Sequence, residues 1–164
     1  MNPVPAVGVV CLRGAEVLLI RRGKPPRLGQ WSLPGGRIEW GERAVDAALR
    51  ELREETGVEA ELTGLIAVVD GLFGFGESEG DAGGEAEQPR HYLLIDYAAR
   101  WLGGDPRPGD DAAAAQWWPL TEVDRLGMWD ETVRVIRAAA ADRAGGGRSD
   151  RAAAAPSTTI FSWR

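Results

Sequence analysis

The feature that most constrains this chain is a stretch between two glycines in which apolar and acidic residues recur at helical spacing. The helical period runs over residues 43–56, and Gly57 stands where a C-terminal helix cap is expected. At about 100° per residue, one stripe of this helix must face a core. That stripe consists of Val45, Ala48, Leu49, Leu52 and Thr56. The chain must therefore provide a packing surface for one well-defined helix.

A second stripe of the same helix carries Glu51, Glu54 and Glu55, with the small Ala47 one turn earlier leaving room above the carboxylates. Like charges at this spacing repel by about 0.2–0.5 kcal/mol per pair, and acids near a helix C-terminus oppose its dipole. Arg50 can orient Glu54, but one guanidinium does not neutralise three acids. Carboxylate oxygens suit Mg²⁺ or Mn²⁺, so the stripe predicts a metal together with a phosphate substrate. For the helix alone, a solvated charged face is the alternative.

Apolar runs elsewhere predict strands at residues 4–12, 17–22, 31–33, 37–40, 91–100 and 114–118, one or two strands at 58–70, and helices at 121–126 and 130–141. Pro34, Gly35 and Gly36 are interpreted as a break between two of these strands. The glycine-rich, acidic segment 71–89 is too long for a turn and is expected to be a flexible active-site flap. We expect one domain over residues 1–141, followed by a flexible or loosely docked tail at 142–164.

Composition excludes several classes of protein. A chain of 164 residues with 44% apolar composition suits a single core. It has no apolar run near the roughly 20 residues of a membrane span and no secretory signal, so we expect a cytoplasmic protein without membrane contact. A net charge of −6 argues against binding to nucleic acid. The only cysteine, Cys11, is expected to be a buried strand residue.

The segment GRIEWGERAVDAALRELREETGV, which begins at Gly36, matches G-x5-E-x7-R-E-U-x-E-E-x-G-U at every position, where U is aliphatic. It resembles the Nudix box, and such a match arises by chance roughly once in 10⁸ starting points. The resemblance implies an α/β fold, specifically a Nudix-type α/β/α sandwich with a mixed β-sheet and a catalytic loop-helix-loop. The expected order of strands and helices over residues 4–140 is similar.

The resemblance also implies roles for individual residues. The implied metal ligands are the carboxylates of Glu51, Glu54 and Glu55 and the backbone carbonyl of Gly35. Arg50 is implied to orient these acids, and Glu42 to support the loop and helix or to bind metal through water. Gly36 and Gly57 are implied to support the architecture. The metal would activate a water that attacks phosphorus, without a covalent intermediate.

The general base differs among relatives of this box. It is either the glutamate matching Glu54, which with Glu51 and Arg50 forms the catalytic set, or an acid from a later loop. Asp110 and Asp111 stand where some relatives supply an additional acidic ligand. Four more loop acids are Glu77, Glu79, Glu85 and Glu87. For each loop acid taken singly, plain solvation is the alternative.

Candidate substrate contacts come from cations and aromatic residues outside the box. Arg27 and Arg90, with Lys24, are candidates for binding phosphate, and solvated loop cations are the alternative. Phe73 is the main candidate for stacking on a base. Phe75, Tyr92 and Trp31 are further candidates, and core packing is the alternative for all of them. The only histidine, His91, is expected to be structural.

The leading functional prediction is a metal-dependent pyrophosphohydrolase that cleaves a nucleoside diphosphate linked to another moiety, with ADP-ribose or a similar nucleotide sugar favoured. The proline and the tyrosine that mark many ADP-ribose and dinucleoside polyphosphate hydrolases are missing after the box. The alternatives are a pyrophosphatase of ordinary or oxidised nucleoside triphosphates and a nucleotide-sensing module that binds without cleavage. An RNA-end hydrolase would need a basic channel. Homodimerisation is common among relatives.

Overall fold

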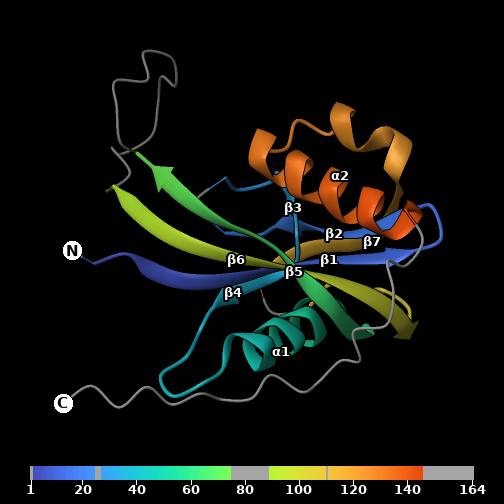
Figure 1. Ribbon diagram of the computed structural model, residues 1–164. Helices are drawn as coiled ribbons and strands as arrows, with labels where there is room; N and C mark the ends of the chain where they lie inside the picture. Colours follow the sequence, from blue (N-terminus) through green and yellow to red (C-terminus); the bar gives the residue numbers. More distant parts are fainter. Residues whose placement is uncertain (1, 25–26, 75–88, 110, 146–164) are drawn as a thin grey trace.

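The computed structural model describes residues 2–24, 27–74, 89–109 and 111–145. Within them, a seven-stranded mixed sheet lies between helix α1 on one face and helix α2 on the other (Figure 1). The elements are β1 (Val4–Arg13), β2 (Glu16–Arg22), β3 (Trp31–Ser32), β4 (Gly35–Arg37), α1 (Ala44–Thr56), β5 (Glu59–Phe73), β6 (Arg90–Gly103), β7 (Ala112–Pro119), the 3-10 helix η1 (Leu120–Arg125) and α2 (Asp130–Ala144). The expected α/β sandwich is confirmed.

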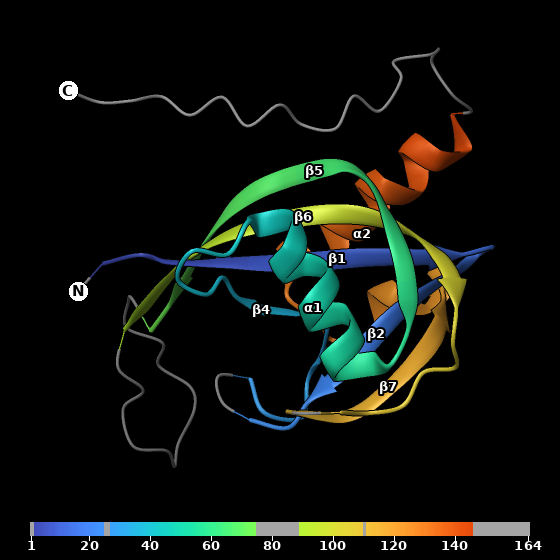
Figure 2. The same cartoon turned by 90° about the horizontal axis from the view of Figure 1, so that it is seen from below.

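The sheet is mixed because β1 pairs in parallel with β6, whereas every other pairing is antiparallel. Strands follow the order β3-β2-β1-β6-β5, and β4 and β7 branch from it by pairing with β1 and β2. Seen from below, α1 lies across one face of the sheet next to β4 (Figure 2). This arrangement brings the amino end of β1, the whole of β4 and helix α1 together, which is where the site forms.

Both faces of the central strands are buried, since successive residues point into different cores. Along β1, Val9 and Cys11 pack toward α1, whereas Val10 and Leu12 pack toward α2. Cys11 is fully buried as expected, and this burial raises the pKa of its thiol to about 12. The continuous apolar runs in the sequence therefore correspond to strands covered on both sides.

Three sequence predictions about local structure need correction. The apolar stripe of α1 is rotated from the expected one: Ala47 is fully buried in the core, whereas Val45 and Leu49 are only half-buried. The expected strand at residues 37–40 lies earlier, at β4, because Gly35 and Gly36 pair with β1. The short helix expected at residues 121–126 is present as the 3-10 helix η1, whereas α2 continues to Ala144 instead of ending near residue 141.

Several expected features lie outside the described residues. They include the central part of the expected flap with Phe75 and its four glutamates, Asp110, and the tail beyond residue 145. Among the described helices, none is both long and apolar enough to cross a membrane.

Candidate active site

Two adjacent glycines bring β4 close to both β1 and α1. Gly35 pairs with Gly8 and has φ of 156°, and a Cβ added there would lie 2.1 Å from the Val7 carbonyl oxygen. A Cβ added to Gly36 would lie 2.5–2.6 Å from the carboxylate atoms of Glu51 on α1. A side chain at Gly35 would meet the backbone of β1, whereas a side chain at Gly36 would meet the end of the Glu51 side chain. The pair was interpreted as a break in the sequence, but it is the strand that holds the helix against the sheet.

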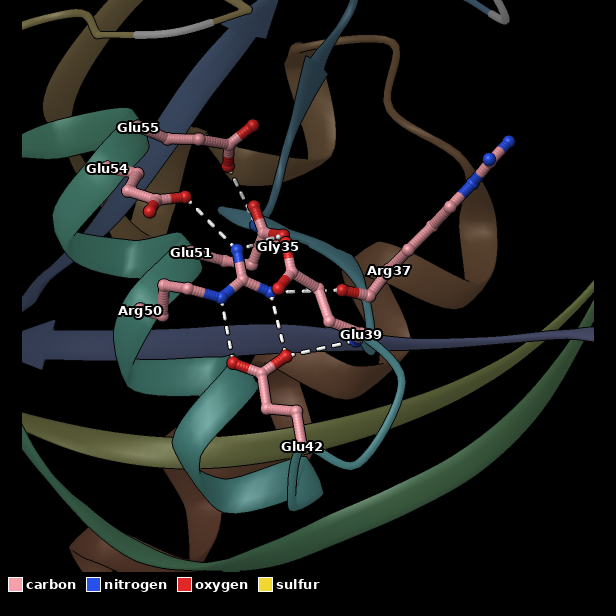
Figure 3. Close-up of polar contacts among 8 residues, drawn as sticks. All are labelled: Gly35, Arg37, Glu39, Glu42, Arg50, Glu51, Glu54 and Glu55. Atoms are coloured by element: carbon pink, nitrogen blue, oxygen red, sulfur yellow. Dashed lines mark hydrogen bonds and ion pairs between the residues drawn. The ribbon is translucent and has the colours of Figure 1, made fainter.

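The guanidinium of Arg50 organises the acids of α1 (Figure 3). Its Nε and Nη2 donate to the two carboxylate oxygens of Glu42 at 2.8 and 3.0 Å. Its Nη1 donates to Glu51 at 2.8 Å and to Glu54 at 3.1 Å, and Nη2 also donates to the Arg37 carbonyl at 3.1 Å. The sequence predicted the Glu54 contact. It did not predict that Glu42, eight positions earlier, would be the bidentate partner.

Glu42 is held by two elements at once. Besides the two bonds from Arg50, its Oε2 accepts a hydrogen bond from the Glu39 amide at 3.0 Å, in the turn before α1. The hydrogen bonds from Arg50, together with that amide, lower the pKa of Glu42 to about 2, and the same contacts raise the pKa of Arg50. Glu42 therefore stays ionised and ties the loop after β4 to the middle of the helix, consistent with a supporting role.

This arrangement predicts a pH-dependent contribution of Glu42 to stability. Because the pKa of Glu42 is about 2 in the folded protein and near 4.5 in an unfolded chain, its contribution is complete above 4.5 and is lost as the pH falls toward 2. In metal-free urea unfolding, Glu42→Gln should be less stable than wild type at pH 6. The gap should shrink steadily below about pH 4.5. A gap that stays constant down to pH 2.5 would contradict this assignment.

The last box acid, Glu55, points toward β4 rather than toward Arg50. Its Oε2 accepts a hydrogen bond from the Gly35 amide at 2.8 Å, and the residue is only 6% exposed. The end of α1 is covered by a loop that satisfies helix carbonyls: Gly109 donates to the Glu55 carbonyl at 3.0 Å and Arg107 to Thr56 at 2.8 Å. Gly57 caps the helix at φ of 69°, as expected. Helix end and strand are thus tied together around one carboxylate.

The acids fit a hard divalent ion by their donor chemistry. Glu51 and Glu55 lie in the wall of one cavity, and Glu54 shares the Nη1 of Arg50 with Glu51. All three offer carboxylate oxygens, the ligand type that Mg²⁺ and Mn²⁺ prefer. Among the described residues, no three acidic, histidine or cysteine side chains already form a group able to hold a metal. The side chain of Glu54 is 50% exposed and lies outside the cavity lining.

The cavity beside these acids has a volume of about 500 Å³ and collects residues from most of the chain. It contains seven residues that the sequence predicted separately as site candidates, namely Lys24, Arg27, Trp31, Phe73, Arg90, Tyr92 and Asp111. It also contains residues that the sequence did not single out for a role in the site, namely Arg22, Arg37, Asp96, Trp129 and Glu131. Only Arg37, directly after the two glycines, had a sequence signal that could have revealed it.

An aromatic and cationic wall closes one side of the cavity. Phe73 and Trp129 meet edge to face, with ring centroids 5.4 Å apart. The Arg27 guanidinium lies 5.0 Å from the Phe73 centroid and 5.4 Å from that of Trp129. Burial, with Arg22 nearby, lowers the pKa of Arg27 below its ordinary value. Phe73 is therefore a cavity residue rather than only a core residue, and Arg27 is held against it.

Two other candidates, Asp111 and His91, each form a polar contact with a neighbouring residue. Asp111 forms an ion pair with Lys24, so this carboxylate lies at the side of the cavity formed by the loop after β2. His91 Nε2 lies 2.9 Å from Asp70 Oδ1 on the neighbouring strand β5. That cross-strand pair agrees with the structural role expected for His91.

Comparison with known proteins gives consistent matches. Residues 2–139 match the family described as the NUDIX domain. The chain is 31% identical to an ADP-ribose pyrophosphatase of Methanocaldococcus jannaschii, over 81% of this chain and 72% of that protein. It is 32% identical to a Mycobacterium tuberculosis protein named "Putative 8-oxo-dGTP diphosphatase 2", over 87% of this chain and 96% of that protein. The crystal structure of a MutT NUDIX hydrolase from Burkholderia pseudomallei aligns with a TM-score of 0.67 at 27% identity, covering 84% of this chain and 98% of that one.

Proposed function

The chain belongs to the Nudix hydrolase family, and from this we propose that it hydrolyses the diphosphate bond of a nucleoside diphosphate linked to another moiety. The observation that carries the proposal is the set of box acids around Arg50, beside a cavity that also contains Arg22, Arg27 and Arg90. Acids that suit a metal and cations that suit phosphate together match a metal-bound diphosphate.

The roles of the residues follow from their contacts. Enzymes of this family generally need a divalent ion, which we propose is Mg²⁺ or Mn²⁺ and which would supply charge neutralisation and an activated water. Glu51, Glu54 and Glu55 would hold it, together with the Gly35 carbonyl. Arg50 keeps Glu51 and Glu54 in place through its Nη1, so it acts as a positioning residue.

We propose Glu54 as the general base. Half of its side chain is exposed, and among the described residues only Arg50 forms a hydrogen bond with it, at 3.1 Å, so its carboxylate can reach a water at the cavity. Asp111 is the alternative acid, but its ion pair with Lys24 ties it to the opposite loop. In-line attack of water on phosphorus then releases two phosphorylated products, with the proton passing to Glu54.

For the substrate, a nucleotide sugar such as ADP-ribose is favoured over a nucleoside triphosphate. Supporting it are the relative named ADP-ribose pyrophosphatase and a cavity of about 500 Å³, within the range that holds small ligands. The second candidate, an oxidised nucleoside triphosphate, is supported by the relative whose name includes 8-oxo-dGTP diphosphatase, aligned over 96% of its length. A sensor that binds without cleavage would be expected to lack box acids, and none is lacking here.

A product assay separates these candidates. The protein is incubated with ADP-ribose, a nucleoside diphosphate sugar, dGTP or 8-oxo-dGTP, each with Mg²⁺, with Mn²⁺ or with a chelator. We expect metal-dependent release of AMP and ribose 5-phosphate from ADP-ribose, with a higher kcat/KM than for either triphosphate. Diphosphate release from 8-oxo-dGTP at the higher kcat/KM would favour the second candidate. Tight binding without turnover of any compound would replace the enzyme by the sensor.

A further inference from the structure

One buried acid in the cavity is not explained by metal or phosphate binding. Asp96 lies in the middle of β6, opposite Gly8 of β1, and is only 6% exposed, yet it lines the cavity. A Cβ added to Gly8 would come within 2.2 Å of Asp96 Oδ1. The glycine therefore leaves the space that the carboxyl group occupies on the cavity floor.

Asp96 has no partner that would account for burying it. Among the described residues, none forms a hydrogen bond or an ion pair with its carboxyl group. The charged groups that act on it are Arg134 and Glu131 of α2, and these two are already paired with each other at 2.8 Å. Burial raises the pKa of Asp96 to about 6. An acid without a partner costs folding free energy, so its place on a core-facing strand calls for a ligand.

Several of the side chains that flank Asp96 are apolar. Leu94 and Ala98, the next residues on the same face of β6, pack against the core on the α2 side. Leu33, which is 9% exposed, lies within 3.6 Å of the same added Cβ at Gly8. Trp129 and Glu131 belong to the same cavity. A polar group flanked by these apolar side chains fits a flat ring with one polar edge better than a sugar with several hydroxyl groups.

Charge decides which part of a nucleotide can lie there. Of the five acids that line the cavity, Asp96 and Glu131 are neither box acids nor paired with Lys24, and their charges would repel phosphate, which the arginines attract. Carboxyl oxygens accept hydrogen bonds from N–H groups, and the exocyclic amino group of a purine is such a donor. We propose that Asp96 binds the nucleobase by accepting a hydrogen bond from the exocyclic amino group of a purine lying on the cavity floor. This inference rests on the proposed function, because it takes the ligand to be a nucleotide.

The test is equilibrium binding of product-like monophosphates, which needs no turnover. AMP is compared with purine riboside 5′-monophosphate, and GMP with IMP, so that each pair differs only in one amino group. For the wild type we expect about 5-fold or greater preference for the amino member of one pair, the size of one hydrogen bond. Whether AMP or GMP is the preferred ligand shows whether the site binds adenine or guanine.

Two variants of Asp96 and one control variant test whether Asp96 causes that preference. Asp96→Ala should bind both members of the pair equally, Asp96→Asn should keep part of the preference through its one remaining acceptor, and Asp105→Ala, an exposed acid outside the cavity, should behave as wild type. The melting temperature of both Asp96 variants should equal or exceed that of wild type, since they remove a buried acid without a partner. A purely structural Asp96 would instead lower it.

Several outcomes would overturn the inference. They are no preference in either pair for the wild type, no measurable binding of any monophosphate at millimolar concentration, or an unchanged preference in folded Asp96→Ala. If Asp96→Ala lost the preference for AMP over 2′-deoxyAMP but kept the preference for the amino group, Asp96 would contact the sugar. That result would also contradict the inference. Amino preference without hydrolysis of any substrate would reject the proposed function alone, and hydrolysis without amino preference would reject only this inference.

Discussion

Glu51→Gln should lower kcat by about 10³-fold while leaving the protein folded. Glu51 is only 13% exposed, lines the cavity and shares the Nη1 of Arg50 with Glu54. The amide keeps the size of the side chain but removes the negative charge that a metal needs. Stability should change by less than about 1 kcal/mol, because a group of like charges loses one member while Arg50 keeps its two bonds to Glu42.

The measurement is initial rate against metal concentration, together with urea unfolding of the same samples. Glu54→Gln should lose a comparable factor in kcat if Glu54 is the base, and raising the metal concentration should not restore it. Glu61→Gln is the matched control, since Glu61 pairs with Arg100 on the sheet and lies outside the cavity. If the Glu51 variant turns over substrate as fast as the Glu61 variant does, the box acids are not the metal site.

Gly36→Ala should separate activity from folding. The new Cβ would lie 2.5–2.6 Å from the carboxylate atoms of Glu51, which sit at the end of a flexible side chain and can move away. We therefore expect a fall in kcat of about 10²-fold, the usual effect of displacing a catalytic group by about 1 Å, with a small loss of stability. The same assays as for Glu51→Gln check both quantities.

Gly35→Ala is the contrasting variant at the adjacent residue. There the added Cβ would lie 2.1 Å from the Val7 carbonyl oxygen, at a backbone φ of 156°, and a neighbouring strand cannot move aside. We expect a loss of stability of about 1–3 kcal/mol, as for other overpacked positions. If Gly35→Ala and Gly36→Ala lost stability equally, the side chain added at Gly36 would be displacing the strand and not only the Glu51 carboxylate.

Much of the site was accessible from the sequence because its spacing is local. Residues three and four apart lie on one face of a helix, so the positions of Glu51, Glu54 and Glu55 relative to one another followed from the chain alone. The same holds for the Gly57 cap and for the burial of Cys11 in its apolar run. Matching the box then identified the reaction class before any contact was known.

Local spacing was also the source of the errors. The helical spacing predicted that Ala47 lies beside the carboxylates. The strands that pack against α1 decide which face of the helix is buried, and they bury Ala47 and leave Val45 half-buried. Likewise, two glycines after a proline look like a turn, although here they permit close approach to β1 and α1. Helical periodicity and turn residues indicate the local backbone conformation, but they do not indicate which other element packs against it.

The sequence by itself determined helix α1, the spacing of its acids and the family, because these depend on contacts within one turn or on fixed spacing. Only the tertiary structure decided that Arg50 holds Glu42, that Arg27 lies against Phe73 and Trp129, and that Asp96 lines the same cavity as Glu51. The residues of these contacts lie eight or more positions apart in the chain, beyond the reach of one helical turn. Strand alternation tells which face a side chain takes, but strand order and register decide what it meets there.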